Sequence, residues 1–480
     1  MKYHSTRGKA PVLNFDEVVL TGLARDGGLY VPEDYPKFTP EKWRQLRGKS
    51  YQDVAFEVMM PFIGDSIKPD ILRTLINDAY ANFRHQAIAP VKQLDTNHFL
   101  LELFHGPTLA FKDYALQFLG KLFDHLLGER GERLTILGAT SGDTGSAAIE
   151  ACRDKGSIDI FMLHPYNRTS EIQRKQMTTV RAANVHNIAL RASFDDCQAI
   201  VKALLGDLSF RDKYKLSAVN SINWARILAQ VVYYVYAALS LGAPDRLVSF
   251  AVPTGNFGNV FAAYVAKQMG LPIGRLAVGT NKNDILTRFF ESGEMRTEPV
   301  SPSLSPSMDI QVSSNFERLL FDAYDRDAAR VTEAMLGFGD VGSFKVPPDT
   351  LAKLRELFRG GRIEDDSITQ IIRETYQRTQ EIIDPHTAVA CAPHLLQGLP
   401  QDSVHISLAC AHPAKFPDAI HTAIGISPPL PQFLSHLFEQ PEQFTVLEND
   451  PTAVKDFIEK ELEVNFASNP PSADNCYSSK

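Results

Sequence analysis

The sequence predicts an α/β protein with largely parallel sheets. From residue 98 onward, short apolar segments alternate with helical stretches, and glycine-containing turns join several of them. Apolar strands are predicted at 98–104, 134–137, 158–163, 247–252 and 404–409. Strands that alternate with helices are typical of parallel sheets flanked by helices.

The length of 480 residues is sufficient for two to four domains. We expect an N-terminal domain, two α/β domains and a polar, disordered tail, at residues 1–95, 96–245, 246–468 and 469–480. Within the first domain, helices are predicted at 51–63 and 69–83. A Pro/Ser-rich segment, 299–307, is predicted to be a loop near a site.

Composition excludes several classes of protein. The 49 basic and 57 acidic residues give a net charge of −8, and no basic run predicts nucleic-acid binding. The five cysteines are scattered without a C-x-x-C pair, which argues against a disulfide scaffold and a metal site. The N-terminus lacks an apolar signal region, and polar residues interrupt the apolar segment 227–243. We therefore expect a cytoplasmic protein without a membrane span, in which 227–243 is a buried helix.

Lys112 lies on the apolar side of a helix predicted at 109–127. The polar stripe of this helix consists of Asp113, Gln117, Lys121 and Asp124, whereas Lys112 shares a face with Leu116, Leu119 and Phe123. A buried ammonium group tends to lose its proton, and a neutral lysine is a nucleophile suited to forming a Schiff base. The alternative is that Lys112, in the first turn, bends outward and keeps its charge in water.

Two glycine-containing loops, 139–145 (ATSGDTG) and 253–259 (PTGNFGN), each join a strand to a helix. Backbone N–H groups at such a helix start favour anions. Neither loop matches the P-loop or the dinucleotide fingerprint. The alternative is that both are ordinary turns whose polar residues cap helices. Together with a lysine on a buried face, they favour a phosphorylated aldehyde cofactor and a second anion beside it.

Six motifs in order along the chain resemble the threonine synthase family. They are LFHGPTLAFKD (103–113), ATSGDTGSAA (139–148), SINWARILAQVVYY (221–234), PTGNFGN (253–259), DPHTAVA (384–390) and AHPAKF (411–416). Within the family, the sequence most resembles the animal threonine synthase-like group. The resemblance implies a pyridoxal-phosphate enzyme of fold type II, the tryptophan synthase β class.

The resemblance also implies roles for individual residues. Lys112 matches the lysine that binds the cofactor covalently, and it is the expected catalytic base. The expected contacts with the cofactor further include Asp143, Gly255, Asn256, Phe257, Gly258, Asn259 and Cys410. The expected contacts with the substrate are Ser141, Gly142, Thr144, Asn223 and Arg226. Arg226 suits a substrate phosphate, and the alternative is a structural arginine.

Two departures from the family pattern bear on the product. Cys410 stands where the family commonly has a threonine that meets the pyridine nitrogen, and Ala192–Ser193 replaces the usual Gly and Thr. With the animal-like resemblance, they favour a phospho-lyase that converts O-phosphohomoserine or O-phosphothreonine to 2-oxobutyrate, ammonia and phosphate. The alternative is a threonine synthase, which adds water to make threonine. A third possibility, a non-catalytic signalling protein, is disfavoured because Lys112 and the 255–259 loop, which matches the family's cofactor-phosphate loop, are both present.

Overall fold

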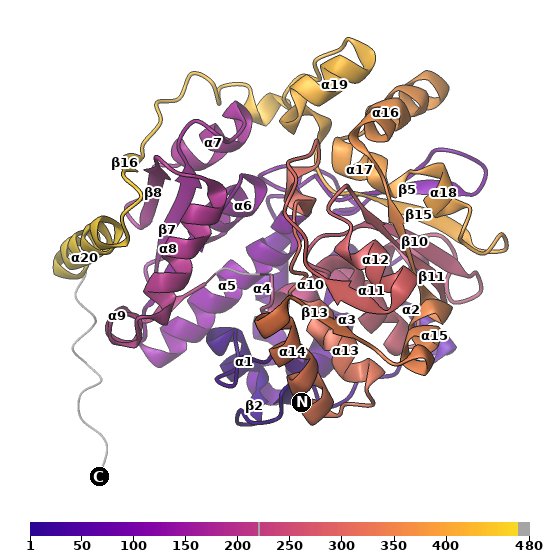
Figure 1. Ribbon diagram of the computed structural model, residues 1–480, viewed down its shortest axis with the longest axis horizontal. Helices are drawn as coiled ribbons and strands as arrows, with labels where there is room; N and C mark the ends of the chain where they lie inside the picture. Colours follow the sequence, from indigo (N-terminus) through magenta and orange to yellow (C-terminus); the bar gives the residue numbers. More distant parts are fainter. Residues whose placement is uncertain (219–220, 469–480) are drawn as a thin grey trace. The chain divides into compact units, whose positions relative to one another are not determined.

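The computed structural model describes residues 1–218 and 221–468, and Figure 1 labels most of their helices and strands. It separates into two compact units. The first comprises Met1–Ala115 and Ser221–Pro429, and the second comprises Leu116–Asn220 and Leu430–Lys480. Each unit is therefore built from two separate stretches of the chain. The predicted boundaries at 95 and 245 stay a prediction, and the predicted disordered tail, 469–480, lies outside the described residues.

A six-stranded sheet forms the centre of the first unit. Its strands, in spatial order, are β14 (Phe358–Arg362), β11 (Ile273–Thr280), β10 (Val248–Pro253), β15 (Val404–Ala409), β5 (His98–Glu102) and β4 (Val91–Gln93). All neighbours are parallel except β4 and β5. β10 is buried along its whole length, as expected of a parallel strand covered on both faces. The predicted strands at 98–104, 247–252 and 404–409 are confirmed.

Two smaller sheets and most of the helices complete the first unit. The sheets consist of β1 (Lys2–Ser5), β2 (Leu13–Asn14) and β3 (Tyr30–Pro32), and of β12 (Glu294–Arg296) and β13 (Ser343–Lys345). The helices are α1 (Phe15–Thr21), α2 (Pro40–Leu46), α3 (Tyr51–Ile63), α4 (Pro69–Tyr80), α10 (Trp224–Ser240), α11 (Gly258–Gln268), α12 (Ile285–Ser292), α13 (Phe316–Ala323), α14 (Ala328–Val341), α15 (Pro348–Leu357), α16 (Asp365–Thr379), α17 (Pro385–Ala390), α18 (Pro393–Leu396) and α19 (Pro417–Ile424). The helices predicted at 51–63 and 69–83 are confirmed by α3 and α4.

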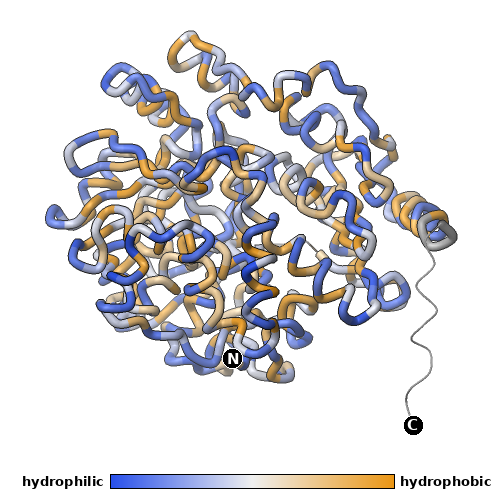
Figure 2. Tube along the Cα trace, turned by 180° about the vertical axis from the view of Figure 1, so that it is seen from behind, coloured by the Kyte–Doolittle hydropathy of each residue, from blue (hydrophilic) through white to orange (hydrophobic). Residues whose placement is uncertain are grey.

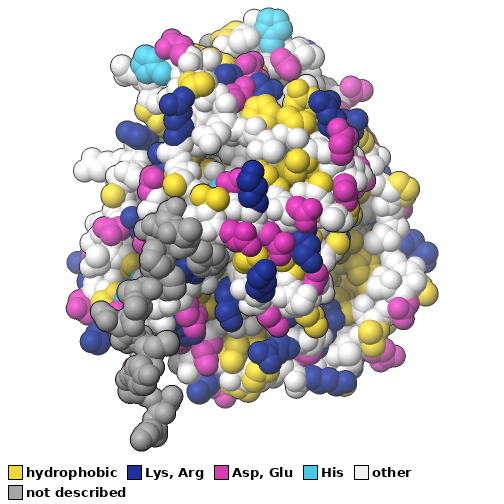
Figure 3. Space-filling view, turned by 90° about the vertical axis from the view of Figure 1, so that its left-hand side faces the viewer, with side chains coloured by type: hydrophobic (Ala, Val, Ile, Leu, Met, Phe, Trp, Pro, Cys, Tyr) yellow, Lys and Arg dark blue, Asp and Glu magenta, His cyan; other side chains and the backbone are white. Residues whose placement is uncertain are grey.

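α10 is the buried helix that the apolar segment 227–243 predicts. All its side chains are buried except those of Tyr236 and Ser240, and it packs against α3 and α11. A helix that is apolar around its whole circumference belongs in a protein core. Among the described residues, no helix combines the length and the hydrophobicity needed to span a bilayer. On the face seen in Figure 3, basic and acidic side chains are interspersed.

The second unit contains a parallel five-stranded sheet. Its strands, in spatial order, are β16 (Thr445–Leu447), β8 (Val185–Leu190), β7 (Ile158–Pro165), β6 (Leu134–Ala139) and β9 (Leu216–Ser217). Its helices are α6 (Asp143–Cys152), α7 (Glu171–Thr178), α8 (Phe194–Gly206), α9 (Leu208–Tyr214) and α20 (Pro451–Ser468). Val454, Ile458 and Leu462 of α20 are fully buried against α8. Figure 2 shows hydrophobic and hydrophilic residues alternating along this helix.

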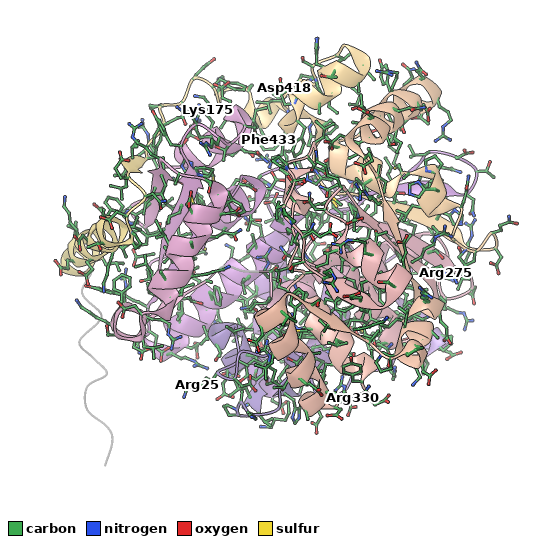
Figure 4. All side chains as sticks on the ribbon, viewed as in Figure 1. Arg25, Lys175, Arg275, Arg330, Asp418 and Phe433 are labelled. Atoms are coloured by element: carbon green, nitrogen blue, oxygen red, sulfur yellow. The ribbon has the colours of Figure 1, made fainter. Side chains whose placement is uncertain are left out.

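The C-terminal stretch of the second unit is fastened to α7. Glu442 accepts hydrogen bonds from Arg174 Nε (2.8 Å) and from the Thr178 hydroxyl (2.7 Å). Lys175, labelled in Figure 4, donates to the carbonyl of Phe438 (3.3 Å). These contacts lead the chain to β16, which extends the sheet beside β8.

Helix α5 (Lys112–Arg130) begins three residues later than predicted. Leu109 has a φ of +63°, which is incompatible with a helix, so residues 109–111 form a turn. Leu116, Leu119 and Phe123 are buried, as predicted for the face of Lys112. The predicted polar stripe is only partly correct, because Asp113 and Gln117 are buried as well.

Candidate active site

Three predicted site segments follow three neighbouring parallel strands. The 255–259 loop follows β10, Cys410 follows β15, and the turn that leads to Lys112 follows β5. β15 lies between β10 and β5 and pairs with both. Ligands of open α/β sheets bind at the carboxyl ends of such strands, so this edge of the first unit is the candidate active site.

Backbone contacts fix Lys112 beside the end of β15. Phe111 N–H donates to the carbonyl of Cys410 (2.8 Å), and Ala110 forms an antiparallel bridge with Ala411. The Lys112 side chain is 8% exposed, and its Nζ donates to Ser307 Oγ (3.3 Å). The alternative in which this side chain bends into water is therefore wrong. That its amine is uncharged stays a prediction.

The residue after the lysine anchors the helix start. Asp113 is fully buried and accepts hydrogen bonds from the N–H (2.9 Å) and the hydroxyl (2.6 Å) of Thr108. Lys415 Nζ donates to the Thr108 carbonyl (2.8 Å). Burial raises the pKa of the Asp113 carboxyl to about 6, against the opposing effect of these hydrogen bonds. The backbone position of Lys112 is thus fixed by the contacts of the turn that precedes it and by those of Asp113, which follows it.

The 255–259 loop ends in an amide donor without a partner. Asn259 is 7% exposed, and its Oδ1 accepts hydrogen bonds from the hydroxyls of Tyr233 (2.5 Å) and Tyr234 (2.7 Å). Its Nδ2 has no hydrogen-bond partner among the described residues. Two hydroxyl donors on one oxygen fix the orientation of the amide. The NH₂ group is therefore held ready for an acceptor at the start of α11.

Arg226 is a buried cation, and two of its three nitrogens lack a hydrogen-bond partner among the described residues. It is 5% exposed, and its Nε and Nη1 form no hydrogen bond with any described residue. Burial lowers the pKa of its guanidinium group to about 10. Asn223 lies at the start of the same helix, and both polar atoms of its side chain have partners within the protein. Its Oδ1 accepts a hydrogen bond from Ala225 N–H (3.0 Å), and its Nδ2 donates to the Val19 carbonyl (2.8 Å). A substrate role for either residue stays a prediction.

The 141–145 loop belongs to the second unit, between β6 and α6. Gly142 has a φ of +152°, and a Cβ there would lie 2.4 Å from Gln173 Cδ, so glycine is required. Thr140 Oγ1 accepts from the N–H groups of Gly142 and Gly145 (both 2.9 Å), and Gln173 Nε2 donates to Asp143 Oδ1 (2.8 Å). The loop is therefore held rigidly. The ligand roles predicted for its residues stay predictions.

Several side chains that contact the predicted site residues escaped sequence analysis. They are Ser307, Gln173, Tyr233 and Tyr234. The two tyrosines lie within the motif at 221–234, and Ser307 ends the loop predicted to lie near a site. Neither pattern indicates which residue these side chains contact.

Comparisons with known proteins agree with this arrangement. Residues 2–80 match the description "Threonine synthase N terminus", 84–336 match "Pyridoxal-phosphate dependent enzyme" and 387–458 match "Threonine synthase, C-terminal". The chain is 51% identical to the threonine synthase of Pseudomonas aeruginosa over 95% of this chain and 98% of that protein. The chain belongs to the threonine synthase family. It is a pyridoxal-phosphate-dependent enzyme of fold type II, as predicted.

A solved structure supports the same assignment. The pyridoxal-phosphate-bound threonine synthase of Brucella melitensis superimposes with a TM-score of 0.94 at 51% identity, covering 96% of this chain and 99% of that one. The rat threonine synthase-like 2 protein is only 36% identical, with 90% of each chain covered. The expected special resemblance to the animal group is therefore not supported within the family.

The residues present fit pyridoxal phosphate. Lys112 could supply an amine for the aldehyde, and the start of α11, with an Asn259 Nδ2 that has no partner among the described residues, could supply donors for the phosphate. Cys410, 5% exposed, directly follows β15, and its predicted contact with the ring nitrogen stays a prediction. A thiol is a weaker hydrogen-bond partner than a hydroxyl, so such a contact would differ from the family's usual one.

Proposed function

We propose that this protein is a threonine synthase, which converts O-phosphohomoserine and water to threonine and phosphate. The observation that supports this most is the 51% identity, over nearly the whole chain, to a bacterial threonine synthase. The expected phospho-lyase activity is not favoured over this alternative. Of its two grounds, the resemblance to the animal group is weaker, at 36% identity, and the departures at Cys410 and Ala192–Ser193 do not by themselves decide the product. O-Phosphothreonine and 2-oxobutyrate therefore become the substrate and product of the second candidate.

Each residue has a distinct task in the proposed reaction. The bound cofactor supplies an electron sink for charge that develops on the substrate. Lys112 Nζ takes the proton from the substrate Cα and then moves protons at Cβ, since it is the amine placed at this edge of the sheet. Asn259 and the start of α11 hold the cofactor phosphate.

The Arg226 guanidinium is the proposed ligand of the substrate phosphate. Its Nε and Nη1, which have no partner among the described residues, gain charge-assisted hydrogen bonds when a phosphate binds, and these offset the cost of burying the cation. Phosphate leaves as an anion during the reaction, so the same contacts stabilise the leaving group. The 141–145 loop, with N–H groups at the start of α6, is the proposed site of the substrate carboxylate.

Product analysis tests the proposal. Purified protein with pyridoxal phosphate is incubated with O-phosphohomoserine or with O-phosphothreonine, and threonine, 2-oxobutyrate and phosphate are quantified. We expect threonine and phosphate in equal amounts from O-phosphohomoserine. If 2-oxobutyrate were instead the main product, the phospho-lyase assignment would replace this one.

A further inference from the structure

The Pro/Ser-rich segment of the first unit is tied down at several points. Asn281, which directly follows β11, donates through Nδ2 to Ser303 Oγ (2.7 Å) and to Asp309 Oδ1 (2.8 Å). Asn283 Nδ2 donates to the Ser301 carbonyl (2.8 Å) and also to Asp309 Oδ1 (3.0 Å). The segment therefore has a defined course, which ends at Ser307 beside Lys112.

Ser307 is held through its backbone by a buried histidine. Its N–H donates to His386 Nε2 (3.3 Å), and His386 Nδ1 lies 2.7 Å from Asp384 Oδ2. His386 is 4% exposed and Asp384 is fully buried. Because Nδ1–H donates a hydrogen bond to the carboxylate, Nε2 is left as the acceptor that the Ser307 N–H requires. The backbone is thereby fixed, and the hydroxyl is directed to the lysine amine.

We propose that Ser307 orients the reacting amine of Lys112, and that His386 and Asp384 are the positioning residues that hold Ser307 in place. A neutral amine carries two N–H groups and one lone pair. When one N–H is held on Ser307 Oγ, rotation about the Cε–Nζ bond is restricted and the direction of the lone pair is fixed. Orientation of a nucleophile or base in this way accelerates its reaction. The inference rests on the proposed role of Lys112.

The residues that follow this segment, 308–313, pack against the 255–259 loop, which provides a way to separate orientation of the amine from general structural support. A Cβ on Gly255 would lie 2.9 Å from Ile310 Cδ1 and 3.3 Å from Met308 Cα. Ser313 Oγ donates to the Gly255 carbonyl (2.7 Å). Collapse of the segment would therefore weaken phosphate binding, whereas loss of the Ser307 hydroxyl alone leaves it intact.

The test compares Ser307→Ala with Ser307→Thr, which keeps a hydroxyl, and with Ser301→Ala as the matched control. Ser301 lies on the same segment with an exposed side chain. For the full-length apoprotein, absorbance after mixing with pyridoxal phosphate gives the rate of reaction with the amine, and calorimetry gives the affinity for inorganic phosphate. Borohydride reduction and peptide mapping of the wild type locate the reacting lysine.

We expect Ser307→Ala to slow the reaction of the amine about tenfold, equivalent to about 1.4 kcal/mol, at unchanged phosphate affinity. Ser307→Thr and Ser301→Ala should react like the wild type. His386→Leu should resemble Ser307→Ala, and His386→Gln should recover most of the rate because its amide oxygen can accept the Ser307 N–H. With the adduct on Lys112, an unchanged rate in Ser307→Ala, or an equal loss of phosphate affinity, overturns this inference alone. An adduct elsewhere overturns the proposed function with it.

Discussion

Two buried arginines of the first unit, Arg226 and Arg318, differ in how their guanidinium groups are satisfied. Arg318 lies on α13, is fully buried, and donates to the carbonyls of Tyr30 and Ile222 and to Asn315 Oδ1. Arg226 is 5% exposed, yet two of its three nitrogens have no partner among the described residues. Burial lowers the pKa of both groups, to about 9 for Arg318 and about 10 for Arg226.

The difference identifies Arg318 as a structural arginine and supports the proposal that Arg226 binds a ligand. A satisfied guanidinium cross-links the chain, so its removal leaves buried carbonyls unpaired. An unsatisfied guanidinium costs stability until an anion binds, so its removal should harm binding rather than folding. Asn259 resembles Arg226 in this respect, because its buried Nδ2 also has no hydrogen-bond partner among the described residues.

The largest effect is expected for Arg226→Met, which keeps the length of the side chain and removes the charge. We expect kcat/KM for O-phosphohomoserine to fall roughly a thousandfold, about 4 kcal/mol, because the phosphate loses charge-assisted hydrogen bonds. The melting temperature should stay equal or rise. Steady-state kinetics and calorimetric melting check both. A variant that retains its kcat/KM but loses stability would make Arg226 the structural arginine.

Arg318→Met should show the converse behaviour. We expect a loss of roughly 3–4 kcal/mol in the free energy of unfolding, because three buried acceptors lose their donor. Urea unfolding followed by circular dichroism measures this loss. At a temperature where the variant is folded, its KM should match that of the wild type, and a raised KM at full stability would contradict the comparison.

Asp113 gives a prediction for the dependence of stability on pH. Its folded pKa of about 6 lies above the ordinary value of 3.8. Between these two pH values, the carboxyl is therefore protonated in the folded state and ionised in the unfolded state. The contribution of this carboxyl to stability is therefore present below pH 4 and is lost as the pH rises to 6. The loss is on the order of 2–3 kcal/mol.

Replacement of Asp113 by Asn should remove this part of the pH dependence, since an amide does not titrate. The measurement is urea unfolding at several pH values between 4 and 7 for the wild type and Asp113→Asn. Parallel pH profiles for the two proteins would show that Asp113 ionises in the folded state as it does in the unfolded chain.

The smallest effect concerns the orientation of the Asn259 amide. The double variant Tyr233→Phe/Tyr234→Phe frees Oδ1 and should weaken pyridoxal-phosphate binding about tenfold, about 1.4 kcal/mol. Each single variant leaves one hydroxyl on Oδ1 and should have less than half this effect. Equilibrium dialysis measures the affinity. Tyr80→Phe, which removes a buried hydroxyl bonded to the Tyr114 carbonyl, is the matched control.

The segments of the candidate site that follow strands could be located from the sequence, because a strand, a polar turn and a helix are local signals. They include Lys112 and the 255–259 loop. The contact between Ser307 and His386 could not be predicted, because 79 residues separate the two and no local sequence pattern around either residue indicates the other as its partner. The late start of α5 also escaped prediction, because a positive φ at a leucine leaves no mark on hydrophobic periodicity. The N-terminal sheet escaped because strands of two to four residues are too short to show alternation.

The edge position of β16 has a consequence during protein synthesis. β16 pairs with β8, which is translated about 250 residues earlier, so ribosomes working at roughly 5–20 residues per second leave that edge open for about 12–50 s. Until then the nascent second unit exposes unpaired backbone groups of β8 and the apolar side of α8 that α20 later covers. Chains that stop before residue 445 keep the unpaired edge of β8 and the exposed apolar side of α8 permanently, and they should accumulate as aggregates or be bound by chaperones.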